Sequence, residues 1–431
     1  MKKMFAICMA MLLVFSLACF AGAEDWTEKE ITLVFEEHVA NVQQQAPQIY
    51  AAAQAFMEKY PNVTIELVGN SEDVYTQKMK LAAQSDTLPD IFWLAYADAV
   101  EFMNAGYLAE LGQSLNQETE LIESFLPNAY GVLSSEDGGV YGISCEMQCD
   151  CYWINKALFE QYNVPLPSTW EDMLAAAEIF NQNGVIPLAM GTSASLGTWM
   201  VREAIWYYDL GEIYPQILEG SAKWSNDTFK AFYENWEAAR EAKLLPESSV
   251  TLDYYAAREL FLTGQAAMFG SGTWDTSVME SSEIAQDIYF WWGPTFENAP
   301  VQEQIQMITA GNPYVVSKRA QEDPAKFAAI VEFLKFYYGP EGSAIVVHTN
   351  SVPVTKFSGE QNEEETPVFA RVIQEISTAK VPLDISAKSY MAPDIYSAFE
   401  ESFLGVFNGV FTPETACETM DMQVQMALMT Q

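Results

Sequence analysis

Short apolar runs alternate with amphipathic segments through the first third of the chain. Residues 30–38, 63–68 and 88–94 read as strands, and the segments that follow them have the spacing of helices. Pro61 and Gly106 end two of these helical segments. This alternation predicts an α/β fold in which helices cover a largely parallel sheet. Ligands bind beyond the carboxyl ends of the strands in such sheets, so we expect functional residues there.

The rest of the chain continues the mixture of strands and helices and contains no internal repeat. Residues 167–184 carry their own start and stop signals, because Ser168 or Thr169 can cap a helix there and Gly184 ends it. The acidic, polar segment 359–367 is the expected solvated loop. Further strands and helices are expected within 141–155, 255–274, 288–296, 308–317, 323–339 and 397–428.

The first 23 residues have the features of a secretory signal peptide. Two lysines precede an uncharged apolar run over 4–20, which is shorter than the roughly 20 residues of a membrane-spanning helix. No later segment is long and uncharged enough to cross a bilayer. We therefore expect the protein outside the cytoplasm, and a retained N-terminal anchor is the less favoured alternative.

The signal offers two endings. Cys19 in the run SLAC is a candidate for lipidation, whereas the small residues before Glu24 allow cleavage after Ala23. Leu17 lies one place later than a lipidation motif prefers, and the bulky Phe20 follows the cysteine. Cleavage after Ala23 is therefore favoured, which gives a free protein in the periplasm or at the cell surface. A lipid anchor at Cys19 is the alternative.

Length and charge narrow the class of protein. About 400 residues follow the signal, more than one hydrophobic core usually organises, so two domains are expected. Half of the residues are hydrophobic, which supports packed cores. The formal net charge is −38 and becomes more negative without the two signal lysines. A surface this acidic repels phosphate backbones, which argues against nucleic acid as a partner.

Four cysteines follow the signal, too few for a disulfide scaffold. They are Cys145, Cys149, Cys151 and Cys417. The first three alternate with polar residues within 141–155, and this period of two indicates one strand on which they face a core as small hydrophobes. A metal site is the alternative, but the chain has only two histidines, and cysteines on one strand face diverge. We therefore assign no metal.

Common enzyme motifs are absent from the sequence. It has no phosphate-binding glycine-rich loop, no paired-histidine zinc motif and no Gly-x-Ser-x-Gly elbow. Two histidines also make a histidine-based triad unfavourable. A glycosidase needs only two carboxylates, and the 59 acidic residues leave that class open without specifying a pair. No catalytic residue and no cofactor are assigned.

Seven sequence fragments, taken in their order, carry a family resemblance. They are FMEKYPNVTIEL (56–67), LPDIFW (88–93), NAGYLAEL (104–111), YGI with INKALFEQYNVPLPSTWEDMLAAA (141–143 and 154–177), TGQAAMFGSGTW (263–274), AAIVEFLKFYYGPEG (328–342) and TPETACETM (412–420). Together they resemble the family 1 extracellular solute-binding proteins of ABC sugar importers, the group that includes maltose-binding protein. The resemblance runs from about Ile31 to the C-terminus, and the order of the fragments is more specific than any one of them.

Two positions depart from the pattern of this family. Ser144 stands where a proline often follows Tyr-Gly-Ile, and Cys417 replaces the usual leucine of the last fragment. Neither departure changes the expected fold, although the first bears on the local hinge geometry.

The resemblance implies a two-lobed, periplasmic-binding-protein-like fold of type II. Each lobe is expected to be a mixed, mostly parallel sheet flanked by helices, and crossover hinge strands are expected to join the lobes. The implied bounds are 27–143 and 306–353 for lobe 1, and 144–305 and 354–431 for lobe 2, after a signal peptide at 1–23.

The resemblance also implies a function without a chemical reaction. It implies a monomer that captures a sugar or oligosaccharide in an interlobe cleft by hinge closure. The carbohydrate would then pass to two membrane permease subunits with cytoplasmic ATPases. A secreted glycoside hydrolase with a carboxylate pair is one alternative, and a lectin-like surface protein is another.

Aromatic rings stack on the C–H faces of sugars, and carboxylates accept hydrogen bonds from sugar hydroxyls. Trp274 is the strongest candidate because neighbouring glycines let the backbone bring its ring to an edge. Trp93 has the alternative of sealing a core, and Glu37 and Glu146 have the alternative of being solvated charges. The residues that the matching motifs put at the cleft are Phe35, Glu37, Trp93, Tyr96, Glu146, Trp199, Trp274, Asp275, Trp292 and Tyr396.

Three further tryptophans of the second region are expected to pack inside the protein. Trp153, Trp170 and Trp206 lie in core-facing patterns. Trp291 and Trp292 point to opposite sides of their strand, so only one of them can face the cleft.

Overall fold

The computed structural model describes residues 26–192, 203–357, 364–379 and 391–430. The signal peptide at 1–23, Cys19 and Trp199 therefore lie outside the described residues. The described chain forms two compact units, each with its own mixed sheet and flanking helices. The predicted α/β class is confirmed.

The boundaries of the two units differ slightly from the bounds expected for the lobes. Unit 1 comprises the residues up to Glu146, together with Ala310–Thr349 and Pro353–Phe357, and unit 2 comprises the remainder. Residues 144–146 lie in unit 1, whereas 306–309 lie in unit 2. From the sequence, 144–146 was expected in lobe 2 and 306–309 in lobe 1.

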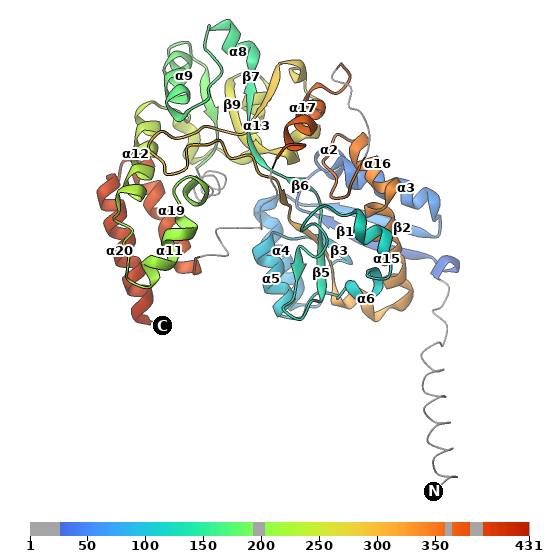
Figure 1. Cartoon of the computed structure of the whole chain (residues 1–431). Helices are drawn as coiled ribbons and strands as arrows, with labels where there is room; N and C mark the ends of the chain where they lie inside the picture. The colour runs from blue at the N-terminus through green and yellow to red at the C-terminus, as the bar shows by residue number, and fades with distance from the viewer. Residues whose placement is uncertain (1–25, 193–202, 358–363, 380–390, 431) are drawn as a thin grey trace, which may run out of the picture. The chain divides into compact units, whose positions relative to one another are not determined.

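Unit 1 is built on a six-stranded sheet (Figure 1). Its strands are β1 Ile31–Glu37, β2 Val63–Gly69, β3 Ile91–Trp93, β4 Leu133–Ser134, β5 Val140–Ser144 and β12 Pro313–Val316. They lie in the order β2-β1-β3-β12-β5-β4. Strand β1 is parallel to β2 and β3, as the alternation of strands and helices predicts, whereas β12 runs antiparallel to its neighbours β3 and β5. The carboxyl ends of β1 and β3 therefore meet at one edge of the sheet.

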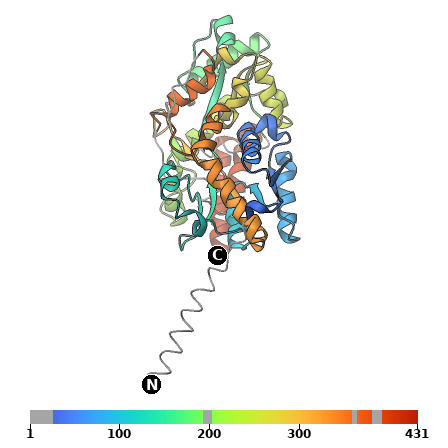
Figure 2. The same cartoon turned by 90° about the vertical axis from the view of Figure 1, so that its right-hand side faces the viewer.

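Helices from both ends of the sequence pack on this sheet. Figures 1 and 2 show α3 (Pro47–Lys59) beside α15 (Pro324–Tyr338) and α16 (Pro340–His348). Phe56 and Phe333 meet edge to face in the core between them, with ring centroids 5.2 Å apart. The other helices of unit 1 are α2 Val42–Gln45, α4 Glu72–Gln84, α5 Tyr96–Asn104, α6 Gly112–Leu115 and α7 Thr119–Ser124, with 3-10 turns η2 Trp26–Glu28 and η6 Lys318–Glu322.

Unit 2 is built on a four-stranded sheet. Its strands are β7 Asp150–Asn155, β8 Ile186–Ala189, β9 Ala266–Gly272 and β10 Ile288–Trp291, in the order β10-β7-β9-β8. Strand β7 runs antiparallel to β9 and β10, and β8 runs parallel to β9. Strand β9 is buried along its whole length, so its C-terminal end is held firmly for the residues that follow it.

A large aromatic core joins the helices of unit 2. The expected helix pair near the C-terminus is confirmed as α19 (Pro393–Phe407) and α20 (Pro413–Thr430). Trp236 packs edge to face against both Trp170 and Phe403, with ring centroids 5.1 Å and 5.0 Å away. The other helices of unit 2 are α8 Lys156–Gln161, α9 Trp170–Gln182, α11 Leu210–Leu218, α12 Asp227–Glu241, α13 Tyr254–Leu262, α14 Thr276–Glu280 and α17 Pro367–Ile376, with 3-10 turns η3 Glu247–Val250, η4 Thr273–Asp275 and η5 Ala285–Asp287.

Three tryptophans expected to pack inside unit 2 do so. Trp153 and Trp170 are fully buried. Trp206 is partly buried and packs against the same core. Their large apolar surfaces therefore contribute to stability, which leaves other aromatic residues as candidates for binding.

Helix α9 begins and ends where its sequence signals predict. Thr169, rather than Ser168, provides the cap, and its hydroxyl accepts a hydrogen bond from the Asp172 N–H at 3.1 Å. The Asp172 carboxylate accepts in return from the Thr169 N–H at 3.0 Å. Gly184 follows the helix with a φ of +72°, a conformation that favours glycine.

The prediction of one continuous strand at 141–155 is wrong. The segment is divided into β5, a two-residue strand β6 (Met147–Gln148) and β7. Strand β6 leaves both large sheets and pairs with β11 (Thr309–Ala310). The pairing of β6 with β11 determines where the predicted strand is interrupted. Because β11 is distant in sequence, local alternation of residues does not reveal this pairing.

The cysteines of this segment are buried, as expected. Cys145, Cys149 and Cys151 are at most 8% exposed and are not in disulfides. Tyr152 and Ile154, on the opposite face of β7, are buried as well. The strand is therefore covered on both faces rather than on one.

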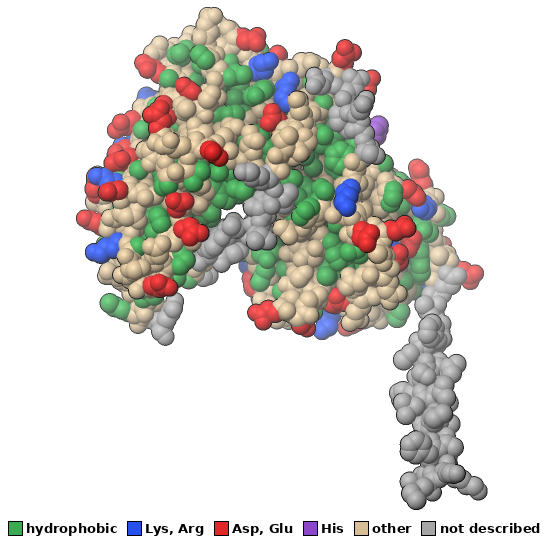
Figure 3. Space-filling view, in the orientation of Figure 1, with side chains coloured by type: hydrophobic (Ala, Val, Ile, Leu, Met, Phe, Trp, Pro, Cys, Tyr) green, Lys and Arg blue, Asp and Glu red, His purple; other side chains and the backbone are tan. Residues whose placement is uncertain are grey.

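The surface and the helices add two observations. Figure 3 shows Asp and Glu side chains spread over the visible face of the molecule rather than gathered in one patch.

Among the helices that the structure describes, none has the length and apolar character needed to cross a membrane.

Candidate functional site

Two buried carboxylates mark the carboxyl end of β1 in unit 1. Glu36 and Glu37 are the last residues of this strand and are only 4% and 1% exposed. The parallel register with β3 brings the residues after that strand to the same edge, which is the expected position of a ligand site in an α/β sheet. Buried carboxylates need hydrogen-bond partners, and both have them.

Glu37 is held between an aromatic hydroxyl and a histidine. The Tyr314 hydroxyl donates to its Oε1 at 2.6 Å, and His38 Nδ1 lies 3.2 Å from its Oε2. Burial, followed by the charge of Glu37, raises the pKa of Tyr314 well above its usual value. Tyr314 therefore remains a donor at any physiological pH.

His38 and Trp93 form a stacked pair beside these carboxylates. Their rings are nearly parallel, at 17°, with centroids 3.8 Å apart. The Tyr75 hydroxyl lies behind the pair and donates to the Trp93 carbonyl at 2.7 Å. Trp93 is itself only 7% exposed, so the ring seals the unit and offers little of its own face.

Glu36 is neutralised by polar partners from the next elements. Asn70 donates to its Oε1 at 2.8 Å, and Lys78 forms a short ion pair with the same oxygen. Glu36 is therefore already satisfied within unit 1.

The other candidates of unit 1 have different surroundings. Phe35 is fully buried and meets Tyr314 edge to face at 5.0 Å, so the structure places it in the core and not at a surface. Tyr96 is partly buried at the start of α5, where its N–H donates to Asn312 Oδ1 at 2.9 Å. Glu146 is partly buried, and its carbonyl accepts from the Ser144 hydroxyl at 2.6 Å.

A tryptophan lies over glycine at the end of β9 in unit 2. Trp274 follows Gly272 by two residues and is partly exposed. A β-carbon built on Gly272 would lie 2.2–2.5 Å from three carbons of the six-membered ring of Trp274. The ring therefore lies flat over the α-carbon of this glycine, and only glycine allows the approach.

The polar edge of Trp274 is also held. Its Nε1 donates to the Tyr254 hydroxyl at 2.6 Å. No aromatic ring of the described residues stacks on the indole, since Trp274 has none of the ring contacts that join the other tryptophans of unit 2. One face of the indole is thus fixed against glycine.

Asp275, the next residue, points into the protein. It is 2% exposed, and its Oδ1 accepts from Arg258 Nη1 at 2.8 Å. Burial lowers the pKa of Arg258, but the charge and hydrogen bond of Asp275, together with the charges of Tyr254 and Tyr255, outweigh it and raise the pKa above its usual value. Asp275 therefore supports the structure from within, although the sequence suggested a place at the cleft.

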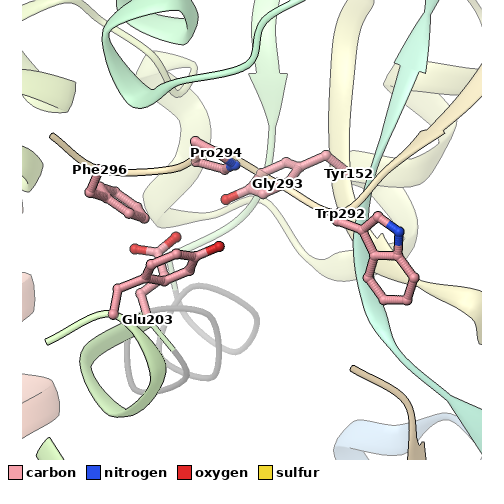
Figure 4. Close-up of a pocket in the computed structure, with 7 residues that line it drawn as sticks. Tyr152, Glu203, Trp292, Gly293, Pro294 and Phe296 are labelled. Atoms are coloured by element: carbon pink, nitrogen blue, oxygen red, sulfur yellow. The ribbon is translucent and has the colours of Figure 1, made fainter. Parts of the chain in front are cut away.

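A small recess in unit 2 combines aromatic and acidic groups. Tyr152, Glu203, Tyr207, Trp292, Gly293, Pro294 and Phe296 line about 270 Å³ of space not filled by protein atoms, part of it open to solvent. Figure 4 shows the Tyr152 hydroxyl and the Glu203 carboxylate pointing into the space beside Pro294. Glu203 is only 5% exposed. Such a recess offers rings for stacking and oxygens for hydrogen bonds.

The structure separates the roles of two neighbouring tryptophans. Trp291 belongs to the large aromatic core of unit 2, whereas Trp292 lines the recess. Trp292 Nε1 donates to Glu375 Oε2 at 2.9 Å. Trp292, the residue included among the candidates, follows β10 directly and contributes to the lining of the recess.

Tyr396 lies on α19 in unit 2. It is partly buried and packs against the aromatic core. Burial, followed by the charge and hydrogen bond of Glu400, raises its pKa well above the usual value.

Sequence reasoning missed His38, Glu203 and Tyr254. His38 directly follows Glu37, so the argument that selected the end of β1 applies to it equally. Glu203 and Tyr207 have the i, i+4 spacing of one helix face, which is a usable but weak signal. Nothing local connects Tyr254 with Trp274, because only the packing of α13 on β9 brings them together.

Comparisons with known proteins agree with this architecture. Residues 40–344 match the family described as bacterial extracellular solute-binding protein. An uncharacterised ABC transporter extracellular-binding protein of Pyrococcus horikoshii is 24% identical over 282 residues, 61% of this chain and 63% of that protein. The osmoprotective compounds-binding protein GgtB of Synechocystis is 27% identical over 139 residues, 32% of each chain. The chain thus spans about a third to two thirds of the length of these relatives.

Solved structures show the same fold over nearly the whole chain. A structure from work on xylan utilization by Caldanaerobius polysaccharolyticus has a TM-score of 0.73 at 23% identity and covers 91% of this chain and 99% of its own. A chitin oligosaccharide binding protein has a TM-score of 0.73 at 23% identity, with coverages of 92% and 99%. Maltose-bound MalE3 of T. maritima has a TM-score of 0.70 at 16% identity, with coverages of 92% and 100%.

Proposed function

Because the chain belongs to the bacterial extracellular solute-binding proteins, we propose that it is the carbohydrate-binding subunit of an ABC importer. It captures a sugar or oligosaccharide outside the cytoplasmic membrane and delivers it to two permease subunits with cytoplasmic ATPases. The proposal includes capture by hinge closure, in which the closed form is the one that docks on the transporter.

One observation carries the choice of a carbohydrate. Trp274 presents a partly exposed indole whose other face lies on Gly272 and whose N–H is hydrogen-bonded. A flat apolar ring with its polar edge satisfied suits the C–H face of a sugar. The names of structurally similar proteins, which mention xylan, chitin oligosaccharide and maltose, support the same class of ligand.

Each unit also carries a buried carboxylate with aromatic neighbours. Glu37 and Glu203 are buried carboxylates with aromatic neighbours, and Trp292 lines the recess with Glu203. Carboxylates orient hydroxyl groups, whereas rings recognise apolar faces, and sugars present both. We include Glu37, Trp93, Tyr96, Glu146, Glu203, Trp274 and Trp292 in the proposed binding set, Trp93 through its stacking on His38 and not through an exposed face. We leave out Phe35, whose ring packs on Tyr314, and Asp275, whose carboxylate is paired with Arg258.

A thermal-shift screen tests the proposed function. The mature protein is heated with maltose, xylo-oligosaccharides and chitin oligosaccharides, and at least one of them is expected to raise the melting temperature in a concentration-dependent manner. The sugar is then analysed by chromatography and should be unchanged after prolonged incubation. Release of shorter products would favour the glycoside hydrolase instead.

Small-angle scattering separates a transport protein from a lectin. The proposal predicts a decrease in the radius of gyration when the stabilising sugar is added, because hinge closure makes the protein more compact. A lectin-like protein should bind the sugar and keep one conformation.

The proposed location follows from the N-terminal segment. We propose a secreted protein in the periplasm or at the cell surface, with signal cleavage after Ala23 rather than lipidation at Cys19. Mass spectrometry of the protein isolated from its own membrane fraction and medium decides this point. A mature chain that begins with lipid-modified Cys19 would replace the free carrier by a tethered one.

A further inference from the structure

Two residues of α13 reach the end of β9 from the same helix face. Tyr254 and Arg258 are four residues apart, which places them one turn apart on the helix. Both contact Asp275, which follows Trp274 directly. Trp274, Tyr254, Asp275 and Arg258 are therefore part of one hydrogen-bonded corner, which lies beside the packing of the indole on Gly272.

Most donors and acceptors of this corner can be assigned, but the Tyr254 and Ser271 hydroxyls lie 2.7 Å apart and either can be the donor of that contact. Tyr254 accepts the N–H of Trp274, so its own proton is free to bond elsewhere, and it donates to Asp275 Oδ2. Ser271 donates its hydroxyl proton to the same oxygen. Arg258 donates to Oδ1. The donated hydrogen bonds thus run from Trp274 to Tyr254 and from Tyr254 to Asp275. Arg258 compensates the negative charge of the Asp275 carboxylate.

The tyrosine stays protonated under all ordinary conditions. Burial, followed by the charge of Asp275, raises the pKa of Tyr254 well above its usual value. Its hydroxyl therefore acts both as the acceptor for the indole N–H and as a donor to the carboxylate. Neither role changes with physiological pH.

We propose that Tyr254, oriented by Asp275 and Arg258, is a positioning residue that fixes the indole of Trp274 for a ligand. Gly272 supports one face of the ring and Tyr254 holds its polar edge, so the ring cannot rotate about its side-chain bonds without losing both contacts. The exposed face is then already in its binding orientation when the ligand arrives. Pre-organisation of this kind reduces the entropy lost on binding. The inference rests on the proposed function for its effect on affinity, but not for its geometry.

The arrangement does more than attach α13 to the sheet. The Arg258–Asp275 ion pair joins helix and strand end without Tyr254. Replacing Tyr254 by Phe keeps the ring and the ion pair and removes the hydroxyl, which holds Trp274 and also contacts Ser271 and Asp275. The variant Tyr254→Phe therefore separates the role of the hydroxyl from the attachment of α13 by the ion pair.

The first readout needs no ligand. In protein with ¹⁵N-labelled tryptophan, the Nε1–H signal of Trp274 is assigned by its absence in Trp274→Phe. Its hydrogen exchange is expected to be about tenfold faster in Tyr254→Phe than in the wild type, because the bonded acceptor is gone. Tyr233→Phe is the matched control, since it also removes a buried tyrosine hydroxyl bonded to a serine in unit 2 but lies away from Trp274. The control should leave the Trp274 signal unchanged.

The second readout is affinity for maltose, a xylo-oligosaccharide and a chitin oligosaccharide. For the sugar that binds, Tyr254→Phe is expected to weaken affinity about three- to tenfold, and the double variant with Trp274→Ala should bind no more weakly than Trp274→Ala alone. Independent, additive losses of affinity would reject the positioning role, as would unchanged hydrogen exchange or unchanged affinity in Tyr254→Phe.

Should Tyr254→Phe not fold, Asp275→Asn is expected to give the same faster exchange of the Trp274 N–H, and normal exchange in that variant counts against the proposal. If no sugar binds the wild type, the proposed function fails, and the exchange rates alone decide whether Tyr254 fixes the indole.

Discussion

At the scale of single residues, the partly exposed indole of Trp274 has little freedom. Its ring lies on Gly272 and its N–H is bonded to Tyr254, so the orientation of its exposed face is set before any ligand is present. His38 and Trp93 form a second fixed aromatic pair in unit 1, beside the buried carboxylate of Glu37.

The change Trp274→Ala tests the first of these arrangements. We expect the affinity for the bound sugar to fall by about 1–3 kcal/mol, as for a central aromatic anchor. The melting temperature of the free protein should change little, because the ring is partly exposed and is not part of the aromatic core of unit 2. Calorimetric titration and differential scanning calorimetry measure the two quantities.

Trp26→Ala is a matched control for this prediction. Trp26 is also partly exposed, and its ring lies 5.2 Å from that of Tyr60 in unit 1, away from the proposed binding residues. Its removal should leave the affinity unchanged. Equal affinities for wild type and Trp274→Ala would make Trp274 a packing residue.

The residues of the site were only partly predictable from the sequence. Strand ends identified Glu37 and Trp93, because a parallel sheet collects its carboxyl ends at one edge. Asp275 was assigned to the cleft from its position beside Trp274, yet the ion pair with Arg258 turns it inward. Which neighbour a charged side chain bonds depends on the packing of α13 on β9, and no local pattern encodes that packing.

At the scale of elements, local signals fixed helices more reliably than strands. Helix α9 begins at the capping box of Thr169 and Asp172, both of which are readable in the sequence. The break between β5, β6 and β7 was missed because β6 pairs with β11, whose residues lie far along the chain. Apolar residues on both faces of β7 also weakened the alternation that was used to assign the strand.

The cap of α9 gives a prediction at this scale. Thr169→Ala should lower the free energy of unfolding of unit 2 by about 1 kcal/mol, because the N–H of Asp172 loses its acceptor. Ser168→Ala is the control and should change it by less than about 0.5 kcal/mol, since Thr169 and not Ser168 caps the helix. Urea denaturation followed by tryptophan fluorescence measures both, and equal losses in the two variants would mean that the cap is assigned to the wrong residue.

At the scale of the whole molecule, each unit has its own sheet and aromatic core, and the chain passes between the units more than once. This organisation was predictable from length and from the order of the family fragments. The positions of the crossings were shifted by a few residues, because they depend on the pairing of β6 with β11 rather than on the composition of the segment.

The many buried tyrosines predict a loss of stability at alkaline pH. Burial raises the pKa of Tyr130 to about 12, with Glu110 adding to the shift, and burial with Glu332 raises that of Tyr60 to about 12. The unfolded chain releases these protons near the ordinary tyrosine pKa of about 10, before the folded protein does. The folded state then holds more protons, so stability is complete below about pH 10 and falls as the pH rises toward 12.

Denaturation by urea at a series of pH values, together with phenolate absorbance, checks this prediction. The free energy of unfolding should decline above about pH 10. Part of the phenolate absorbance should appear only when the protein unfolds, because the tyrosines with raised pKa stay protonated in the folded state. Titration of all tyrosines at their ordinary pKa in the folded protein would contradict the packing described for them.

Calorimetric titration of the mature protein with maltose, a xylo-oligosaccharide and a chitin oligosaccharide, followed by chromatography of the recovered sugar, tests the central claim most directly. The account predicts saturable binding of at least one of these sugars at a single site, with the sugar recovered intact. Absence of binding to every sugar, or conversion of the bound sugar into shorter products, would contradict it.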